Sequence, residues 1–231
     1  MKFDLAGLSV MICMPTHRDI HPKTVGALLE TQHELIARGL QFEVQMQVGG
    51  SLVHHSRSKC AYLFLKSDCN RLFWIDSDMV WSAADFFRLL AMSTKMECVS
   101  AIYPSKSDPA DFYLRVNDLS EPFEANEYGC FSLNGLGLGF TVVQRKVIQQ
   151  LSDNAPKRKF NGMDELLPSI FRLDHEGDEE RGEDMAFFSD VRALGYKVHL
   201  DPSISLGHVG SKEYRADFMD LLKATPKELA A

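Results

Sequence analysis

The sequence has no apolar run long enough to span a membrane. A spanning helix needs about 20 consecutive apolar residues, and no stretch of this chain approaches that length. The N-terminal segment, MKFDLAGLSVMICMPT, carries one lysine, an early aspartate and only a short apolar run. We interpret it as a first core strand rather than a signal peptide, and we expect no membrane span.

The five cysteines form no C-x-x-C pair, and they are scattered along the chain at an odd count. A disulfide framework or a cysteine zinc site would need paired, regular spacing. Each cysteine is therefore expected to be a small buried apolar residue in a reduced protein. This pattern predicts a cytoplasmic location.

A basic excess is also missing, since 25 Lys and Arg face 32 Asp and Glu and the net charge is −7. Such a chain does not coat nucleic acid by bulk electrostatics, although a local run such as Lys157–Lys159 could still touch a phosphate backbone. The 231 residues are 45% hydrophobic and 25% charged, which is typical of a globular protein with one sizeable core. No internal repeat or low-complexity tract is present.

The first half of the chain alternates apolar runs with segments of helical spacing. Strands are expected over 8–14, 42–48, 71–75 and 98–102, and helices over 22–38, 52–66 and 83–92. This β-α-β pattern predicts an α/β fold with helices on both faces of a sheet. Ligands of such sheets bind beyond the carboxyl ends of the strands, where Thr16, Gly49-Gly50, Asp76 and Tyr103 fall.

The second half gives weaker signals. Short strands are expected over 112–116, 127–133, 140–143 and 197–200, and helices over 147–151 and 183–194. The polar stretch 152–182 is interpreted as a mobile loop or lid, and the tail from residue 211 as partly helical. Gly135, Gly137 and Gly139 do not follow the first strand and no Lys-Ser/Thr follows them, so a nucleotide-binding P-loop or Rossmann loop is not indicated.

The strongest chemical signal is Leu72-Phe-Trp-Ile-Asp-Ser-Asp-Met79. Two carboxylates two residues apart, Asp76 and Asp78, follow a very apolar strand, and a turn there can aim both at one cation. Mg²⁺ and Mn²⁺ prefer oxygen ligands and commonly bridge to substrate phosphates. The simpler interpretation is that the aspartates only form a turn or cap the next helix.

Ile75-Asp76-Ser77-Asp78 resembles the D-x-D motif of GT-A-fold glycosyltransferases. Three later segments resemble that superfamily in the same order: Gly182-Glu-Asp-Met-Ala-Phe-Phe188, Gly195-Tyr-Lys-Val-His-Leu-Asp-Pro202 and Leu206-Gly-His-Val-Gly210. The similarity runs from about residue 8 to 210 and is nearest to family-2-like and mannan-polymerase-like enzymes, including phage-encoded ones. It implies a Rossmann-like mixed sheet flanked by helices in a single domain, 1–231. About 1–110 would bind the nucleotide sugar, about 111–210 would face the acceptor, and 211–231 would be a tail.

The resemblance also implies roles for individual residues. Asp78 would ligate the metal, His208 would be a further protein ligand, and Asp76 would contact the ribose or the metal through water. Glu183 or Asp184 would be the general base, with Asp184 the better candidate. The simpler alternative is that Glu183 and Asp184 only cap the helix and stabilise its dipole. The remaining donor-side candidates are Pro15, Thr16, Arg57, Lys59, Ser77, Lys106 and Gly137.

Some of these candidates have alternatives. Arg57 could instead be an ordinary helix-surface cation, and His208 could be a structural histidine. Lys106 could steady a phosphate or an acceptor, or it could be a solvated loop cation. Gly137 is expected to let the backbone approach the donor sugar closely.

The predicted function is transfer of a sugar, assisted by Mn²⁺ or Mg²⁺, from a nucleotide-diphosphate sugar to a hydroxyl acceptor. The acceptor could be a glycan, a protein, a small molecule or a modified nucleic acid such as DNA. The location would be cytoplasmic, in the host cytoplasm for a phage-encoded enzyme. One alternative is a non-catalytic GT-A-like module that binds nucleotide or glycan. Another is a phosphatase with Asp76 as nucleophile, but such enzymes usually carry the motif after the first strand and follow it with Thr. The donor sugar, the base, the acceptor, the anomeric outcome and the oligomeric state are left open.

Overall fold

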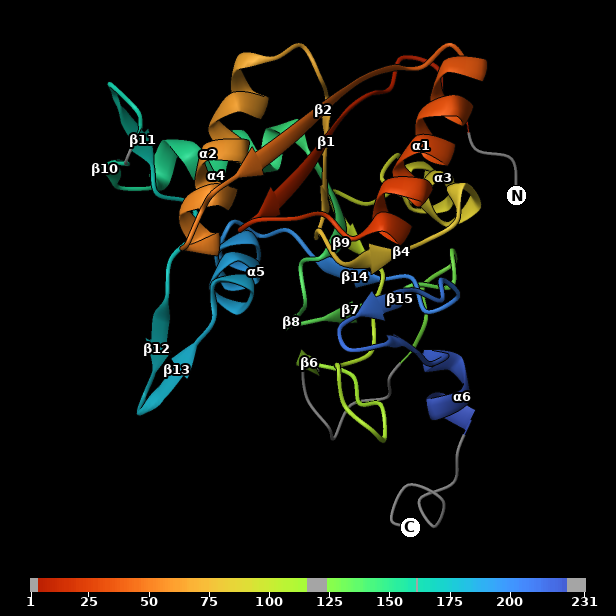
Figure 1. Cartoon of the computed structure of the whole chain (residues 1–231). Helices are drawn as coiled ribbons and strands as arrows, with labels where there is room; N and C mark the ends of the chain where they lie inside the picture. Colours follow the sequence, from red (N-terminus) through yellow and green to blue (C-terminus); the bar gives the residue numbers. More distant parts are fainter. Residues whose placement is uncertain (1–3, 116–123, 161, 224–231) are drawn as a thin grey trace.

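The computed structural model describes residues 4–115, 124–160 and 162–223 (Figure 1). The elements of the first half are β1 (Ser9–Thr16), α1 (Pro22–Ala37), β2 (Gln41–Val48), α2 (Val53–Lys66), β3 (Arg71–Ile75), β4 (Met79–Val80), α3 (Ala83–Met92), β5 (Cys98–Ser100) and β6 (Leu114–Arg115). Those of the second half are β7 (Phe131–Leu133), β8 (Gly135–Leu136), β9 (Phe140–Gln144), α4 (Arg145–Asn154), β10 (Lys157–Lys159), β11 (Leu166–Pro168), β12 (Asp174–Glu176), β13 (Glu179–Arg181), α5 (Glu183–Ala193), β14 (Val198–Leu200), β15 (Gly207–Val209), β16 (Glu213–Arg215) and α6 (Phe218–Lys223).

A seven-stranded mixed sheet forms the centre, in the order β2-β1-β3-β9-β5-β14-β7. β1 pairs in parallel with both β2 and β3, while β9 runs antiparallel between β3 and β5. The carboxyl ends of β1, β2, β3 and β5 therefore lie at one edge of the sheet, together with the amino end of β9. This confirms the predicted mixed α/β sheet. The β-α-β pattern alone did not indicate that a strand of the second half separates β3 from β5.

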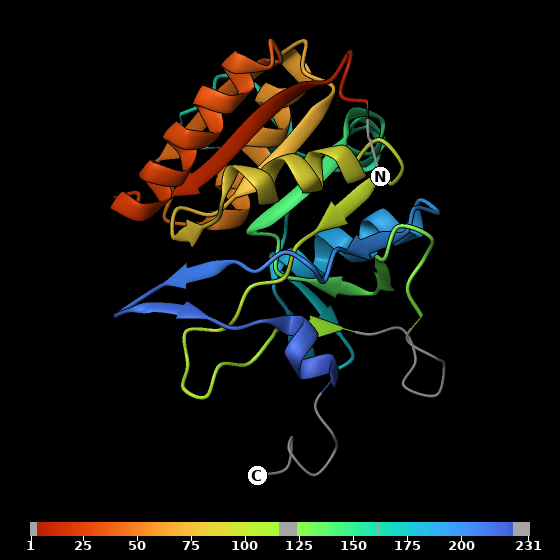
Figure 2. The same cartoon turned by 90° about the vertical axis from the view of Figure 1, so that its right-hand side faces the viewer.

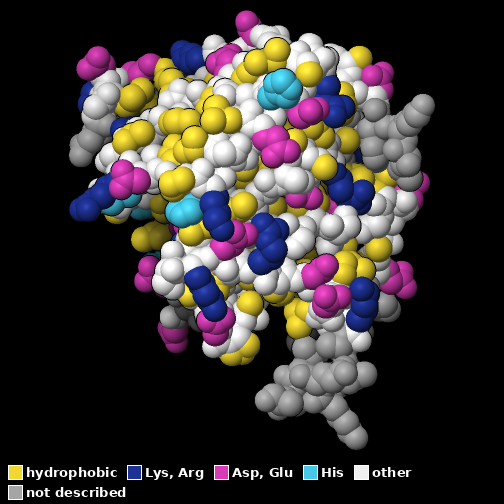
Figure 3. All heavy atoms as spheres, turned by 45° about the vertical axis from the view of Figure 1, so that its right-hand side comes forward, with side chains coloured by type: hydrophobic (Ala, Val, Ile, Leu, Met, Phe, Trp, Pro, Cys, Tyr) yellow, Lys and Arg dark blue, Asp and Glu magenta, His cyan; other side chains and the backbone are white. Residues whose placement is uncertain are grey.

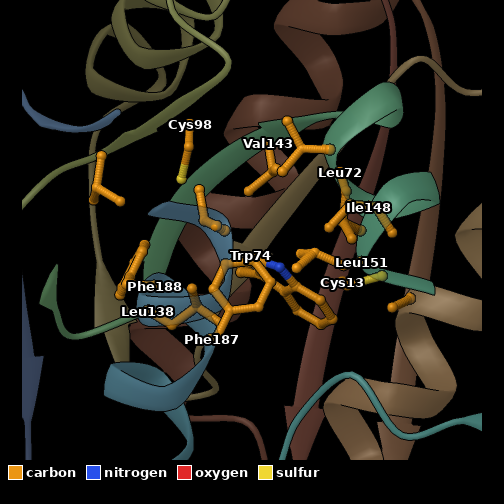
Figure 4. Close-up of a cluster of buried hydrophobic side chains, with 14 of the residues drawn as sticks. Cys13, Leu72, Trp74, Cys98, Leu138, Val143, Ile148, Leu151, Phe187 and Phe188 are labelled. Atoms are coloured by element: carbon orange, nitrogen blue, oxygen red, sulfur yellow. The ribbon is translucent and has the colours of Figure 1, made fainter. Parts of the chain in front are cut away.

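Helices cover both faces of this sheet, with α2, α4 and α5 on one side and α1 and α3 on the other (Figure 1). Strand β3 shows why, because its side chains alternate between the two cores. Leu72 and Trp74 join the core beneath α2, α4 and α5, whereas Phe73 and Ile75 join the other. Figure 4 shows Trp74 at the centre of the first core, beside Phe187 and Phe188 of α5. The strand that leads into Asp76-Ser77-Asp78 is therefore packed on both faces.

Local signals set the ends of the predicted helices. α1 starts at Pro22, where the imidazole of His21 accepts a hydrogen bond from the Lys23 N–H, and it is followed by Gly39 with φ of 65°. α3 starts with a capping box in which Ser82 and Asp85 exchange hydrogen bonds. Both helices agree with the prediction to within a residue or so.

The region 152–182 differs from the predicted loop, because its described residues form two hairpins. β10 pairs with β11 and β12 pairs with β13, both antiparallel, and Figure 1 shows the two hairpins projecting from the body of the molecule. Lys157, Arg158 and Lys159 are all exposed on β10. β10 exposes all three of its residues and β11 is only three residues long, so neither strand leaves an alternating apolar pattern long enough to detect.

Other elements differ in extent from the prediction. The helix expected over 147–151 is the longer α4, and the strands expected over 112–116 and 127–133 shorten to β6 and β7. Residues 116–123, at the end of the first of these, lie outside the described part. The tail contains β16 and α6, which is consistent with partial helicity, and 224–231 lie outside the described part. Figure 2 shows β15 and β16 as a hairpin beside α6.

No helix among the described residues is long and apolar enough to cross a membrane. All five cysteines are buried and none forms a disulfide. On the face shown in Figure 3, basic and acidic side chains are interspersed, with no large basic patch among the described residues.

Candidate functional site

The segment Asp76-Ser77-Asp78 forms a tight turn at the carboxyl end of β3. The N–H of Asp76 donates to the carbonyl of Gly139 at 3.0 Å, and the N–H of Met79 donates back to the carbonyl of Asp76 at 3.2 Å. The carbonyl of Ser77 accepts from the N–H of His21 at 2.9 Å. The turn is thus held from both sides, by the entry to β9 and by the start of α1.

Asp78 is brought beside His208 by the small sheet of β4, β15 and β16. The Val209 N–H donates to the Asp78 carbonyl at 2.8 Å, and His208 is paired with Met79 across β4 and β15. As a result, Nε2 of His208 lies 3.6 Å from Oδ2 of Asp78. Residues 130 positions apart in the chain therefore share one small cluster.

The other ring nitrogen of His208, Nδ1, is hydrogen-bonded to the backbone. Its Nδ1 lies 2.9 Å from the carbonyl oxygen of Pro104, which can only accept, so Nδ1 carries the proton of this bond. A histidine that donates from one nitrogen to a backbone carbonyl presents the other nitrogen in a fixed orientation. Nε2 of His208 therefore faces Asp78 as a preoriented ligand atom.

Lys106 forms an ion pair with Asp78, and its Nζ lies 2.5 Å from Oδ2, the oxygen that also faces His208. Burial alone would raise the pKa of the Asp78 carboxyl, but the neighbouring His208 and Lys106 outweigh burial and hold the pKa below its ordinary value. Asp78 is thus kept ionised, which is the state a metal ligand or an ion-pair partner requires.

Arg57 lies at the centre of a second cluster of acidic side chains. Its side chain is only 3% exposed, and its guanidinium is 3.2 Å from Asp76, 3.5 Å from Asp184 and 3.6 Å from Glu183. This arginine is therefore a buried counter-ion and not a helix-surface cation. It joins α2, the D-x-D turn and the start of α5.

Burial raises the pKa of Asp76 and of Asp184 above the usual carboxyl range. Arg57 opposes this rise in both residues, while the neighbouring carboxylates add to it. The pKa of Arg57 is itself raised, since the three carboxylates outweigh the opposing effect of its burial. The cluster holds three carboxyl groups around one guanidinium, so protonation of Asp184 occurs at a higher pH than for an ordinary aspartate.

The two clusters meet at the loop that leads into β9. Oδ2 of Asp184 accepts from the N–H of Leu138 at 3.1 Å, and the hydroxyl of Tyr103 accepts from the N–H of Gly139 at 3.2 Å. A Cβ on Gly137 would lie 2.2 Å from the Tyr103 hydroxyl, and one on Gly139 would lie 2.7 Å from Oδ2 of Asp76. Both positions therefore require glycine for steric reasons.

Several polar atoms in the second cluster lack a hydrogen bond. Among the described residues, Nε and Nη1 of Arg57 and Oδ1 of Asp184 are buried without a hydrogen-bond partner. Buried polar groups are almost always paired, and exceptions need a physical reason. Here two of these atoms take part in ion pairs, since Nε of Arg57 lies 3.6 Å from Glu183 and Oδ1 of Asp184 lies 3.5 Å from the Arg57 guanidinium.

A hollow of about 180 Å³ lies beside these clusters, where β1 and β2 end. Pro15, Thr16 and His17 line one side, and residues from Gly50 to Ser56 line the other. The predicted donor-side residues Pro15 and Thr16 are therefore placed together. Lys59 is half-buried on α2. The pKa of His55 is lowered by burial, by His54 and, least, by Lys59.

The described residues contain no group of three or more His, Cys, Asp and Glu side chains arranged to hold a metal. Asp76 points to Arg57, which leaves Asp78 and His208 as the pair that could do so. Mg²⁺ and Mn²⁺ usually keep several waters and take few protein ligands when substrate phosphates complete their shell. With the Nδ1 of His208 already fixed, these two residues fit such an ion.

Two features of the site carry no local sequence signal. The sequence places Tyr103 at the ligand-binding edge but indicates no partner for its hydroxyl, and it does not indicate that Arg57 is buried among carboxylates. The sequence clue for Tyr103 is its place directly after the apolar run Cys98-Val-Ser-Ala-Ile102, at the edge where the other site residues fall.

No protein-family description matches the sequence, and no curated protein sequence matches it. Solved structures do match in three dimensions. The chain is similar to A197 from STIV, with a TM-score of 0.56 and 19% identity over 88% of this chain and 86% of that one. It is also similar to GalNAc-T7, solved with UDP, GalNAc and Mn²⁺, with a TM-score of 0.53 and 13% identity over 93% of this chain. That match covers 45% of the GalNAc-T7 chain, so this protein spans less than half of it. At such identities the likeness establishes the fold, which is GT-A-like.

Proposed function

We propose that this chain is a metal-dependent glycosyltransferase that uses a nucleotide-diphosphate sugar and a hydroxyl acceptor. The observation that carries the proposal is the juxtaposition of Asp78 and His208 on one side with Asp184 on the other, at one edge of a GT-A-like sheet. The ion pairs of Arg57 with Asp76, Glu183 and Asp184 support it, because they hold the proposed general base next to the Asp76-Ser77-Asp78 turn. GalNAc-T7 was solved with a nucleotide, a sugar and Mn²⁺, which supports the same assignment.

In this proposal the donor lies across the carboxyl ends of β1, β2 and β3. Pro15 and Thr16 would border the nucleoside, Ser77 would belong to the turn beneath the donor, and Gly137 would admit the sugar close to the backbone. Asp78 and His208 would hold Mn²⁺ or Mg²⁺, and Asp76 would contact the ribose or a metal-bound water. The ion would offset charge that develops on the departing diphosphate.

Asp184 is the proposed general base. Its Oδ2 is occupied by the Leu138 N–H, whereas its Oδ1 has no hydrogen-bond partner among the described residues and could accept the proton of an acceptor hydroxyl. Glu183, 3.6 Å from Arg57, is proposed as a supporting carboxylate. Asp184 would therefore both bind the acceptor and act as its base. The identity of the acceptor, which could be a modified nucleic acid, is left open.

The proposed place of action is the cytoplasm. Five buried cysteines without a disulfide support this proposal, since oxidising compartments favour paired cysteines in stable proteins.

The test separates the donor half from the acceptor half. A thermal-shift screen of nucleotide sugars with and without Mn²⁺ should find a donor that stabilises the protein only with metal. Asp78→Ala and His208→Ala should each abolish this stabilisation and the transfer. Asp184→Asn should keep metal-dependent donor binding but lower kcat by about 10²- to 10⁴-fold, the range for a lost general base.

Asp190→Asn is the matched control, because Asp190 lies on the same helix as Asp184 but pairs with Arg172. It should transfer at the wild-type rate. Full turnover by Asp78→Ala after metal removal contradicts the proposal. Donor binding without release of nucleoside diphosphate, for every acceptor tried, favours the non-catalytic binding module instead.

A further inference from the structure

Lys106 occupies the oxygen of Asp78 that a divalent ion needs. Its Nζ lies 2.5 Å from Oδ2, and Nε2 of His208 lies 3.6 Å from the same atom. The ammonium therefore sits where the carboxylate and the imidazole of the candidate metal pair converge. A lysine ammonium and a Mn²⁺ ion that both contact Oδ2 lie close enough to repel each other, so the two cations compete for this oxygen.

The position of Lys106 is built by its surroundings. The aliphatic stem passes over Gly210, where an added Cβ would lie 3.1 Å from Cδ of Lys106. The loop that carries the lysine is closed by the Ser105 N–H, which donates to the Asp111 carbonyl at 2.6 Å. Lys212 pairs with Asp108 at 2.6 Å, but both side chains are more than half exposed, so this surface pair contributes little to holding the loop.

The backbone of the same loop also orients His208. The Pro104 carbonyl, two residues before Lys106, accepts from Nδ1 of His208 at 2.9 Å. One loop thus fixes a proposed metal ligand and delivers the cation that competes for the other ligand. The Lys106 side chain is 38% exposed, so its long flexible stem has room to move into solvent.

We propose that Lys106 is an internal counter-ion that holds Asp78 when no divalent ion is bound and releases it when the ion arrives. This inference rests on the proposed function, because it takes Asp78 and His208 as the metal pair. Metal binding must break the Lys106–Asp78 pair, so the ion alone binds more weakly than the two ligands would allow. The displaced ammonium stays at the mouth of the site, where it is placed to meet the diphosphate of a donor. Lys106 is a positioning residue in this scheme, and metal and donor bind better together than either does alone.

The test measures Mn²⁺ binding to the protein without donor, by calorimetry and by the Mn²⁺ resonance signal. Lys106→Met should bind Mn²⁺ about two- to fivefold more tightly than the wild type, which is the range for the loss of one partly exposed ion pair. Lys212→Met is the matched control, since it removes a nearby lysine that pairs with Asp108 and not with Asp78. Its Mn²⁺ affinity should equal that of the wild type.

The outcomes separate this inference from the proposed function. Equal or weaker Mn²⁺ binding by Lys106→Met overturns the role of Lys106 while leaving the metal assignment intact. Equal tightening in Lys106→Met and Lys212→Met also overturns it, because the effect would then be the general removal of positive charge. Absence of Mn²⁺ binding in all three proteins overturns both the inference and the metal of the proposed function. Unchanged urea midpoints of the two variants establish that each protein is folded during the titration.

Discussion

Replacing Arg57 with methionine removes the cation that pairs with Asp76, Asp184 and Glu183. The arginine side chain is 3% exposed, and its three carboxylate neighbours lie within 3.6 Å. Removing one partner of a buried ion pair typically costs about 3–5 kcal/mol, because the remaining charge is left without compensation. The carboxylates here are 15–25% exposed and can recover some hydration, so the lower end of that range applies.

We therefore expect Arg57→Met to lower the free energy of unfolding by about 3 kcal/mol. For a chain of this size, that change corresponds to a fall in Tm of about 6–12 °C. Urea unfolding measures it directly. Lys146→Met is the control, since Lys146 pairs with Glu97 at 3.0 Å but is 52% exposed, and breaking such a surface pair should cost less than about 1 kcal/mol.

The pH dependence of this loss gives a second measurement. Burial already raises the pKa of Asp76 and Asp184 in the folded protein, and without Arg57 both values rise further. A carboxyl group with a raised folded pKa stabilises the fold when it is protonated, at low pH. This contribution is lost as the pH rises through the folded pKa. The deficit of Arg57→Met should therefore be smaller at pH 5.5 than at pH 8, as expected for pKa values raised above the ordinary value of about 4.

A loss no larger than that of Lys146→Met would refute this reasoning, because it would mean that Arg57 does not compensate buried charge. A deficit that grows as the pH falls would refute the assignment of raised pKa values to its neighbours.

Two further predictions concern the same edge of the sheet. Because burial raises the pKa of Asp184, the acidic limb of the pH profile of kcat/KM should lie above about pH 4, and a limb at or below that pH would remove Asp184 as the titrating base. Gly139→Ala places a Cβ 2.7 Å from Oδ2 of Asp76 and should cost about 1–3 kcal/mol in urea unfolding. Gly26→Ala, inside α1 with nothing within 4 Å of the new Cβ, should instead stabilise by about 0.5–1 kcal/mol, so equal effects of the two alanines would contradict the steric account of Gly139.

The sequence predicted the first strands and helices of the sheet well because the signals there are local. β1 and β3 are continuous apolar runs, since both of their faces are buried, and Pro22 and Gly39 mark the ends of α1. Asp76 and Asp78 were identifiable because two carboxylates follow such a strand directly.

Features that depend on long-range contacts were not predictable in this way. Nothing in the run Phe140–Gln144 shows that it pairs antiparallel between β3 and β5. The burial of Arg57 depends on three carboxylates, two of which are more than 120 residues distant. The pairing of Lys106 with Asp78 depends on where Gly210 leaves room for the lysine stem. Pattern and spacing therefore located the metal-binding candidates, while the charges around them emerged only from the tertiary structure.

The position of β9 has a consequence for how the chain assembles during synthesis. β1, β2 and β3 pair only with one another until residue 144 has been made, so these three strands can associate early. β5 pairs only with β9 and β14, and it has no neighbour in the sheet until a later part of the chain is available. A fragment that ends near residue 110 would therefore leave one side of β3 and both sides of β5 open to other chains. Such unpaired strands favour aggregation, so we expect that cutting the chain there does not give a soluble, separate first half.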